Sequence, residues 1–161
     1  MATASATLST PPITCDNGTA ESYRMIAPAT RTTARVARAF VTAVLEAEGM
    51  PALVDDACVC VSDVVSNVVQ HARVNTMAVD VNVGEEGVVV GVRDGDTRRW
   101  PRRREPRPED EAGRGLALVR RLSDASGVAL TWDGLDVVGK CVWFSLDQQP
   151  RPQLRAVPAQ G

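Results

Sequence analysis

The sequence predicts an α/β fold, a two-layer α/β sandwich with a mostly antiparallel sheet and helices on one face. Apolar residues repeat at helical spacing through residues 29–72 and then alternate through residues 76–94. A polar, proline-rich stretch follows over residues 95–115. Helical spacing then returns at residue 116, and two more alternating runs complete the pattern by residue 146. Helices and strands in this order group around a single sheet.

The first half of the pattern predicts an edge strand and two helices. The strand is expected over residues 23–27. Thr30 is expected to cap the first helix and Gly49 to close it. Pro51 opens the second helix, because its fixed φ suits a first helical turn, and this helix extends to about Ala72. The apolar positions of the first helix are Val36, Phe40, Val44 and Leu45.

The second half predicts four strands, one helix and a long loop. Strands are expected over residues 76–83, 87–94, 127–132 and 140–146, with a helix over residues 116–126. The loop before this helix is too long and too rich in proline for an ordinary turn. The loop is therefore expected to do more than reverse the direction of the chain.

Composition and length indicate one globular domain. The chain has 161 residues, of which 44% are hydrophobic and 24% charged. Residues 1–21 and 148–161 lack periodicity and are predicted to be flexible tails around a domain over residues 22–147. No apolar run reaches the roughly 18 residues that a membrane span needs, and the N-terminus does not resemble a secretory signal. We therefore expect a cytoplasmic protein with no membrane association.

The net charge of -2 gives no general argument for nucleic acid or an anionic membrane as partner. The cysteines do not form a CxxC pair, and His71 is the only histidine, so zinc-site spacing is absent. We expect the thiols to be reduced and to serve as small apolar residues. The cysteines are Cys15, Cys58, Cys60 and Cys141.

Three polar residues lie on one face of the second predicted helix. Asp63, Asn67 and His71 are spaced four residues apart, within a valine-rich segment. One interpretation is a catalytic carboxylate beside an oxygen ligand for Mg²⁺, because buried polar groups need partners. The alternative is a solvated polar stripe on an amphipathic helix. The spacing alone leaves both open.

Two glycine-containing motifs follow. Asp94 and Gly95 end a strand, where a carboxylate can accept a hydrogen bond from a flat ligand that the glycine allows to approach. Gly113-Arg114-Gly115-Leu116 opens the last helix, where free N–H groups can surround phosphates. The alternatives are a plain Asp-Gly turn and an ordinary helix start.

Taken together, the segments resemble the histidine-kinase-like (GHKL, Bergerat-fold) ATPases. VSDVVSNVVQHA resembles their N-box, VRDGD their first glycine box, GRGLALVRRLSD their second, and VGKCVWFSL their closing strand. The resemblance covers roughly residues 22–147. It is closest to the small bacterial anti-sigma-factor serine/threonine kinases, and it implies the Bergerat ATP-binding fold with ATP and Mg²⁺ as cofactors.

The resemblance also implies roles for single residues. Asn67 matches the asparagine that coordinates Mg²⁺, and Asp94 matches the aspartate that accepts from the adenine amino group, with Gly95 allowing the base to approach. Asp63 matches the general base, which is a glutamate in the family, and residues 96–112 match the ATP lid. The second glycine box, whose backbone surrounds the phosphates, is Gly113, Arg114, Gly115 and Leu116, and His71 has a supporting role.

Two departures from the family pattern affect these expectations. Asp63 is shorter than glutamate by one C–C bond, about 1.5 Å, and a misplacement of about 1 Å can cost around 100-fold in rate. Lys140 and Cys141 lie where close relatives often carry threonine near the nucleotide. The first departure concerns catalysis, and the second concerns the adenine pocket.

The long loop contains an arginine-rich run, RRWPRRREPR, in which Trp100 could stack on a base. Because the acidic segment PEDE follows at once and the chain is net acidic, we expect no direct nucleic-acid binding. The run then belongs either to a lid that meets phosphate charge or to a solvated loop.

Two functions are compatible with these residues. The first is a protein kinase that phosphorylates a small antagonist of an anti-sigma factor. The second is a nucleotide-gated binding module that sequesters a sigma factor or a similar regulator, with little or no phosphoryl transfer. The expected partners are therefore proteins, and a homodimer is compatible with the resemblance.

Overall fold

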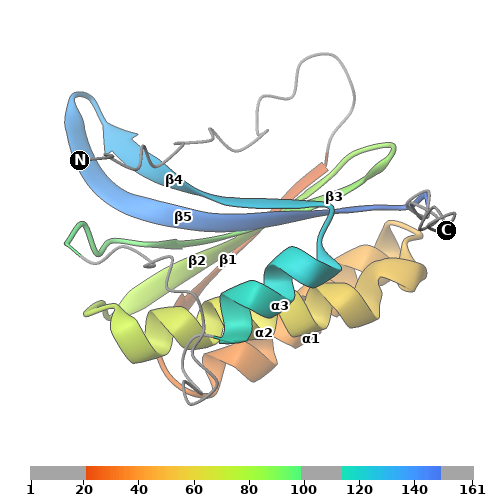
Figure 1. Ribbon diagram of the computed structural model, residues 1–161, viewed down its shortest axis with the longest axis horizontal. Helices are drawn as coiled ribbons and strands as arrows, with labels where there is room; N and C mark the ends of the chain where they lie inside the picture. Colours follow the sequence, from red (N-terminus) through yellow and green to blue (C-terminus); the bar gives the residue numbers. More distant parts are fainter. Residues whose placement is uncertain (1–20, 99–113, 150–161) are drawn as a thin grey trace, which may run out of the picture.

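A computed structural model describes residues 21–98 and 114–149 of the chain (Figure 1). In chain order its elements are β1 (Glu21–Pro28), α1 (Thr33–Ala47), the short 3-10 helix η1 (Pro51–Leu53), α2 (Val54–His71), β2 (Thr76–Val83), β3 (Gly87–Asp94), α3 (Arg114–Leu122), β4 (Ala125–Asp133) and β5 (Asp136–Asp147). The predicted strands over residues 76–83 and 87–94 have the bounds expected of them.

The strands form one five-stranded sheet in the order β1-β2-β3-β5-β4, and every neighbouring pair is antiparallel. Figure 1 shows α1, α2 and α3 on the same face of this sheet. The predicted two-layer α/β sandwich is therefore confirmed. The strand order places β3 and β5 side by side, although the long loop, α3 and β4 separate them in the sequence.

The core lies between the helices and the sheet. Alternate residues of β2 and β3 face the helices and are fully buried, among them Val79, Val81, Val90 and Val92. Helix α2 contributes a matching stripe of small side chains that includes Val61, Val64 and Val65. Valine is a poor helix former, so burial against the sheet, more than intrinsic propensity, stabilises α2.

The start of α1 corrects one prediction. Thr30 does not cap the helix: the residue before its first turn is Thr32, which makes no side-chain capping bond. The buried Thr33 hydroxyl instead donates to the carbonyl of Pro28 and so ties the helix to the end of β1. Gly49 closes the helix as expected, with a positive φ of 73° that suits glycine.

The apolar face of α1 also differs in part from the sequence pattern. Val44 and Leu45 are buried as predicted, but Val36 is 50% exposed. The stripe that faces the sheet is completed by the smaller side chains Ala37 and Val41. Ala37, Val41, Val44 and Leu45 recur at helical spacing, and Val36 lies one position off that stripe.

Several boundaries differ from the sequence-based ones. Strands β1, β4 and β5 are longer than the expected 23–27, 127–132 and 140–146. Pro51 begins the turn η1, which leads into α2, and does not begin α2 itself. Helix α3 ends at Leu122, four residues before the predicted end. The chain leaves the helix there because the backbone N–H of Asp124 donates to the carbonyl of Ser145, 2.9 Å away, which starts the pairing of β4 with β5.

Several predictions fall on parts of the chain outside the described residues. These are most of both tails, most of the lid over residues 96–112, and Gly113. Within residues 21–98 and 114–149, no helix is both long and apolar enough to cross a membrane.

Candidate functional site

Asp63 and Asn67 lie one turn apart on α2, and both are partly buried. The Oδ2 atom of Asp63 is buried and has no hydrogen-bond partner among the described residues. Burial raises the pKa of the Asp63 carboxyl above its ordinary value. A fully solvated polar stripe does not describe this carboxylate. His71 differs, because it is exposed at the last position of the helix.

Asp94 ends β3 and is almost completely buried, with 1% of its side chain exposed. It belongs to the row of alternate residues that faces the helices, together with Val90 and Val92. Its Oδ1 atom accepts from the Lys140 ammonium at 2.8 Å and from the backbone N–H of Asp96 at 2.9 Å. Its Oδ2 atom is buried and finds no partner in the described part of the chain.

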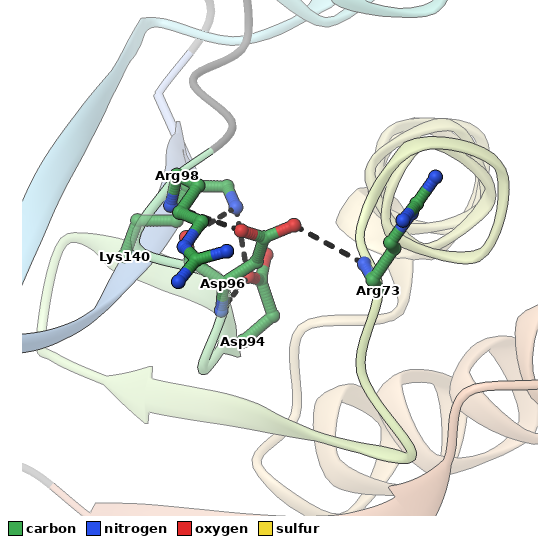
Figure 2. A network of polar contacts seen from close by, with 5 residues as sticks. All are labelled: Arg73, Asp94, Asp96, Arg98 and Lys140. Carbon is green, nitrogen blue, oxygen red and sulfur yellow. Dashed lines mark hydrogen bonds and ion pairs between the residues drawn. The ribbon is translucent and has the colours of Figure 1, made fainter.

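Asp96 links the end of β3 to the segment that follows α2. Figure 2 shows its carboxylate between Arg73 on one side and Arg98 and Lys140 on the other. Its Oδ2 atom accepts from the backbone N–H of Arg73 at 3.1 Å, and its Oδ1 atom accepts from the backbone N–H of Arg98 at 3.0 Å. The Asp96 carbonyl also accepts from Lys140 Nζ at 3.1 Å. The ends of α2 and β3 are therefore held together beside Asp94.

Gly139 allows β5 to lie close to Asp94. A Cβ atom at Gly139 would lie 2.3 Å from the carbonyl oxygen of Asp94, a distance that side chains do not tolerate. At Gly95 a Cβ would make only an ordinary contact, 3.8 Å from the carbonyl of Val138. The described protein atoms therefore require glycine at position 139 but not at position 95. This is compatible with the expectation that Gly95 makes room for a ligand.

The second glycine box is described only in part. Helix α3 begins at Arg114, as the motif predicts, and Leu116 packs against the main core. Gly113 lies outside the described residues, and so do the side-chain surroundings of Arg114 and Gly115. The expected contact of this box with phosphates thus stays a prediction.

A hollow of about 300 Å³ opens at the same end of the sheet and includes Asp94 and Gly95 in its lining. Most of the lining belongs to the face opposite the helices, as with Ala78 and Arg93, whose neighbours along the strands point into the main core. Asp63 does not line it. This hollow therefore lies mainly on the opposite face of the sheet and shares Asp94 and Gly95 with the helix-facing site.

The described residues contain no group of three or more His, Cys, Asp or Glu side chains arranged to hold a metal ion. The free thiols include two buried ones, and burial raises the pKa of Cys60 to about 12 and that of Cys141 to about 11. Thiolate ligation of a metal is thus disfavoured at both. An Mg²⁺ ion shared with phosphates needs few protein ligands, so the expected role of Asn67 as its ligand stays a prediction.

The unpaired oxygens fit the expected ligand. A buried acceptor without a partner costs free energy unless something completes it, and an exocyclic amine is a donor of the right kind for Asp94 Oδ2. The sequence interpretation missed three features of this site: the ion pair of Lys140, the linking role of Asp96, and Gly139. A signal existed for the first, since Lys140 is the single lysine of an arginine-rich chain.

Comparison with known proteins agrees with this geometry. The family model described as the histidine kinase-like ATPase domain matches residues 27–146, which include α1, α2, α3 and the strands from β2 to β5 almost completely. A search of curated proteins found no match. The family match supports an ATP-binding, ATPase-like module. Because it spans well over half of the chain, the protein belongs to the histidine kinase-like ATPase domain family.

Proposed function

We propose that this domain binds ATP with Mg²⁺ and regulates a protein partner, as a serine/threonine kinase of the anti-sigma-factor type. The observation that supports it best is Asp94, whose buried carboxylate offers one unpaired oxygen at the position where the family reads adenine. The partner would be the antagonist protein that accepts the phosphoryl group, or a sigma factor that the domain sequesters.

In this proposal each residue of the candidate site would have a separate role. Asp94 would accept a hydrogen bond from the adenine amine through Oδ2, and Asn67 would supply an oxygen ligand to the metal. ATP supplies the phosphoryl group, and Mg²⁺ neutralises the charge of its phosphates. Asp63, one turn before Asn67, would accept the proton of the attacking hydroxyl group.

A second function rests on the length of Asp63. If the shorter carboxylate does not reach the attacking hydroxyl, the same site still binds nucleotide but transfers phosphate slowly or not at all. The domain would then be a nucleotide-gated binding module that sequesters its partner. The two functions differ only in the rate of phosphoryl transfer, so labelled ATP mixed with candidate partner proteins separates them.

The role of Asp94 is tested by Asp94→Asn. The substituted amide can still accept from Lys140 through its oxygen, but it then presents an N–H group where Oδ2 was, opposite the donor of the base. We expect ATP affinity to fall by about 10-fold or more, the value of one charge-assisted hydrogen bond. Calorimetric titration with Mg-ATP measures this change.

The matched control is Asp133→Asn. Asp133 also ends a strand and precedes a glycine, but it is exposed on β4. It should leave ATP affinity unchanged. Equal affinity of the parent and Asp94→Asn would show that Asp94 does not read the base.

The metal ligand is tested by Asn67→Ala. Removing the amide oxygen should abolish most of the gain in ATP affinity that the parent shows when Mg²⁺ is added. Titrations with and without Mg²⁺ measure that gain. Gln70→Ala is the control, because Gln70 is an exposed amide on the same helix. An undiminished Mg²⁺ effect in Asn67→Ala would remove Asn67 from the site.

A further inference from the structure

The single lysine of the chain lies inside the candidate site. Lys140 is on β5 directly opposite Asp94 in the register of the sheet, and its side chain is 8% exposed. A buried ammonium group is costly unless it is paired and hydrogen-bonded. Lys140 meets this requirement through Asp94 Oδ1 at 2.8 Å and the carbonyl of Asp96 at 3.1 Å.

The two oxygens of Asp94 are consequently unequal. Oδ1 accepts from Lys140 and also from the backbone N–H of Asp96, so the two directions in which it accepts best are occupied. Oδ2 accepts from none of the described groups. The carboxylate therefore offers a ligand one acceptor and not two.

A carboxylate with one free acceptor oxygen can distinguish adenine from other purine bases. Adenine carries an amine at position 6, which can donate one hydrogen bond to Oδ2, whereas guanine and hypoxanthine carry an acceptor oxygen there. Guanine could still donate two adjacent N–H groups to a carboxylate, but only if both oxygens were free. The ion pair with Lys140 removes that option.

We propose that Lys140 is a positioning residue that sets the base specificity of this site: by holding Asp94 Oδ1, it leaves Oδ2 as the only oxygen that reads a 6-amino group. The inference rests on the proposed ATP binding and extends it to the selection of adenine. Lys140 touches neither the base nor the phosphates in this role. It acts through the orientation and charge of Asp94.

The test compares three ligands on two proteins. The ligands are ATP and purine riboside triphosphate, which lacks the 6-amino group, and GTP is the third titrant. The parent should prefer ATP over purine riboside triphosphate by about 10-fold or more. Lys140→Met keeps the length and apolar stem of the side chain but removes its donors, and it should narrow this preference to below about 3-fold.

The ratio of the affinity for ATP to the affinity for purine riboside triphosphate separates a loss of base specificity from a general loss of binding. A purely structural role for Lys140 would weaken all three ligands equally in Lys140→Met, and an unchanged ratio would overturn the inference. If the parent protein does not bind ATP at all, the proposed function is wrong, and this result differs from an unchanged ratio. If Lys140→Met does not fold by circular dichroism, Lys140→Leu replaces it, since its apolar side chain also lacks donors. The same narrowing, at least 3-fold, is then required.

Discussion

Asp63→Asn is expected to lower phosphoryl transfer by about 100-fold or more while ATP still binds, because a positioned general base contributes roughly that factor. Asparagine keeps the shape of the side chain but cannot take up the proton of the attacking hydroxyl. The measurement is transfer of label from ATP to a candidate partner protein, together with calorimetric affinity for ATP.

The complementary substitution is Asp63→Glu, which restores the longer carboxylate of the family. It should raise the transfer rate by roughly 10-fold and leave ATP affinity nearly unchanged, if the reach of the shorter acid limits the parent. Asp56→Asn is the control, since Asp56 is an exposed acid in the first turn of the same helix. If the parent transfers phosphate rapidly and Asp63→Glu transfers it more slowly, then the geometry of the site suits aspartate and not glutamate. Background rates in all variants would favour the binding module.

The Asp63→Asn variant also has an expected effect on stability that does not depend on turnover. The raised pKa of Asp63 means that the folded state binds this proton more tightly than the unfolded state does. The folded protein therefore loses stability as pH rises through that pKa, when the buried carboxyl ionises. Asp63→Asn should melt at a higher temperature than the parent near neutral pH. The difference should vanish below pH 3.8, the ordinary pKa of an aspartate.

Gly139→Ala is expected to disrupt the site and the sheet together. The new methyl group would lie 2.3 Å from the Asp94 carbonyl oxygen and 3.3 Å from Gly95 Cα, both backbone atoms that cannot rotate away. The ends of β3 and β5 must then separate, which moves Asp94 away from Lys140. We expect a loss of about 1–3 kcal/mol in unfolding free energy and a fall in ATP affinity at least as large as that of Asp94→Asn.

The control for this substitution is Gly84→Ala. Gly84 lies between β2 and β3, and a Cβ there would make only one ordinary contact, 3.8 Å from the Gly87 carbonyl. Thermal melts should place Gly139→Ala several degrees below the parent and Gly84→Ala close to it, given about 2–4 °C for each kcal/mol at this chain length. Equal melting temperatures would mean that the two central strands adjust without cost.

The fold was predictable because its strands alternate cleanly. In β2 and β3 every second residue is a buried valine or methionine, except for Asp94 at the end of β3, so the period of both strands is visible in the sequence. The helix boundaries were less predictable, because they depend on contacts between distant segments. Thr33 is fixed by the carbonyl of Pro28, and α3 is ended by the bond from Asp124 to Ser145. No local pattern encodes those contacts.

The candidate site was predictable only where a motif marks it. Asp63, Asn67 and Asp94 are recognisable because they interrupt apolar segments at family positions. The partner of Asp94 was not, since Lys140 lies 46 positions later in the sequence and meets Asp94 only through the register of β3 with β5. Gly139 could not be predicted from a local motif either. Its necessity follows from a backbone approach that exists only in the assembled sheet.

The pairing of β1 with β2 has a consequence for how the chain folds. Pro28 lies opposite Thr76 and Glu21 opposite Val83, so this pairing must close a loop that contains α1 and α2. The hairpins β2–β3 and β4–β5 close over only a few residues and lose far less chain entropy on forming. The pairing of β3 with β5 spans a stretch of similar length, since Asp94 lies opposite Lys140, so β1–β2 and β3–β5 are the two pairings that cost most chain entropy. Asp94 and Lys140 therefore come together only when the second of these pairings has formed.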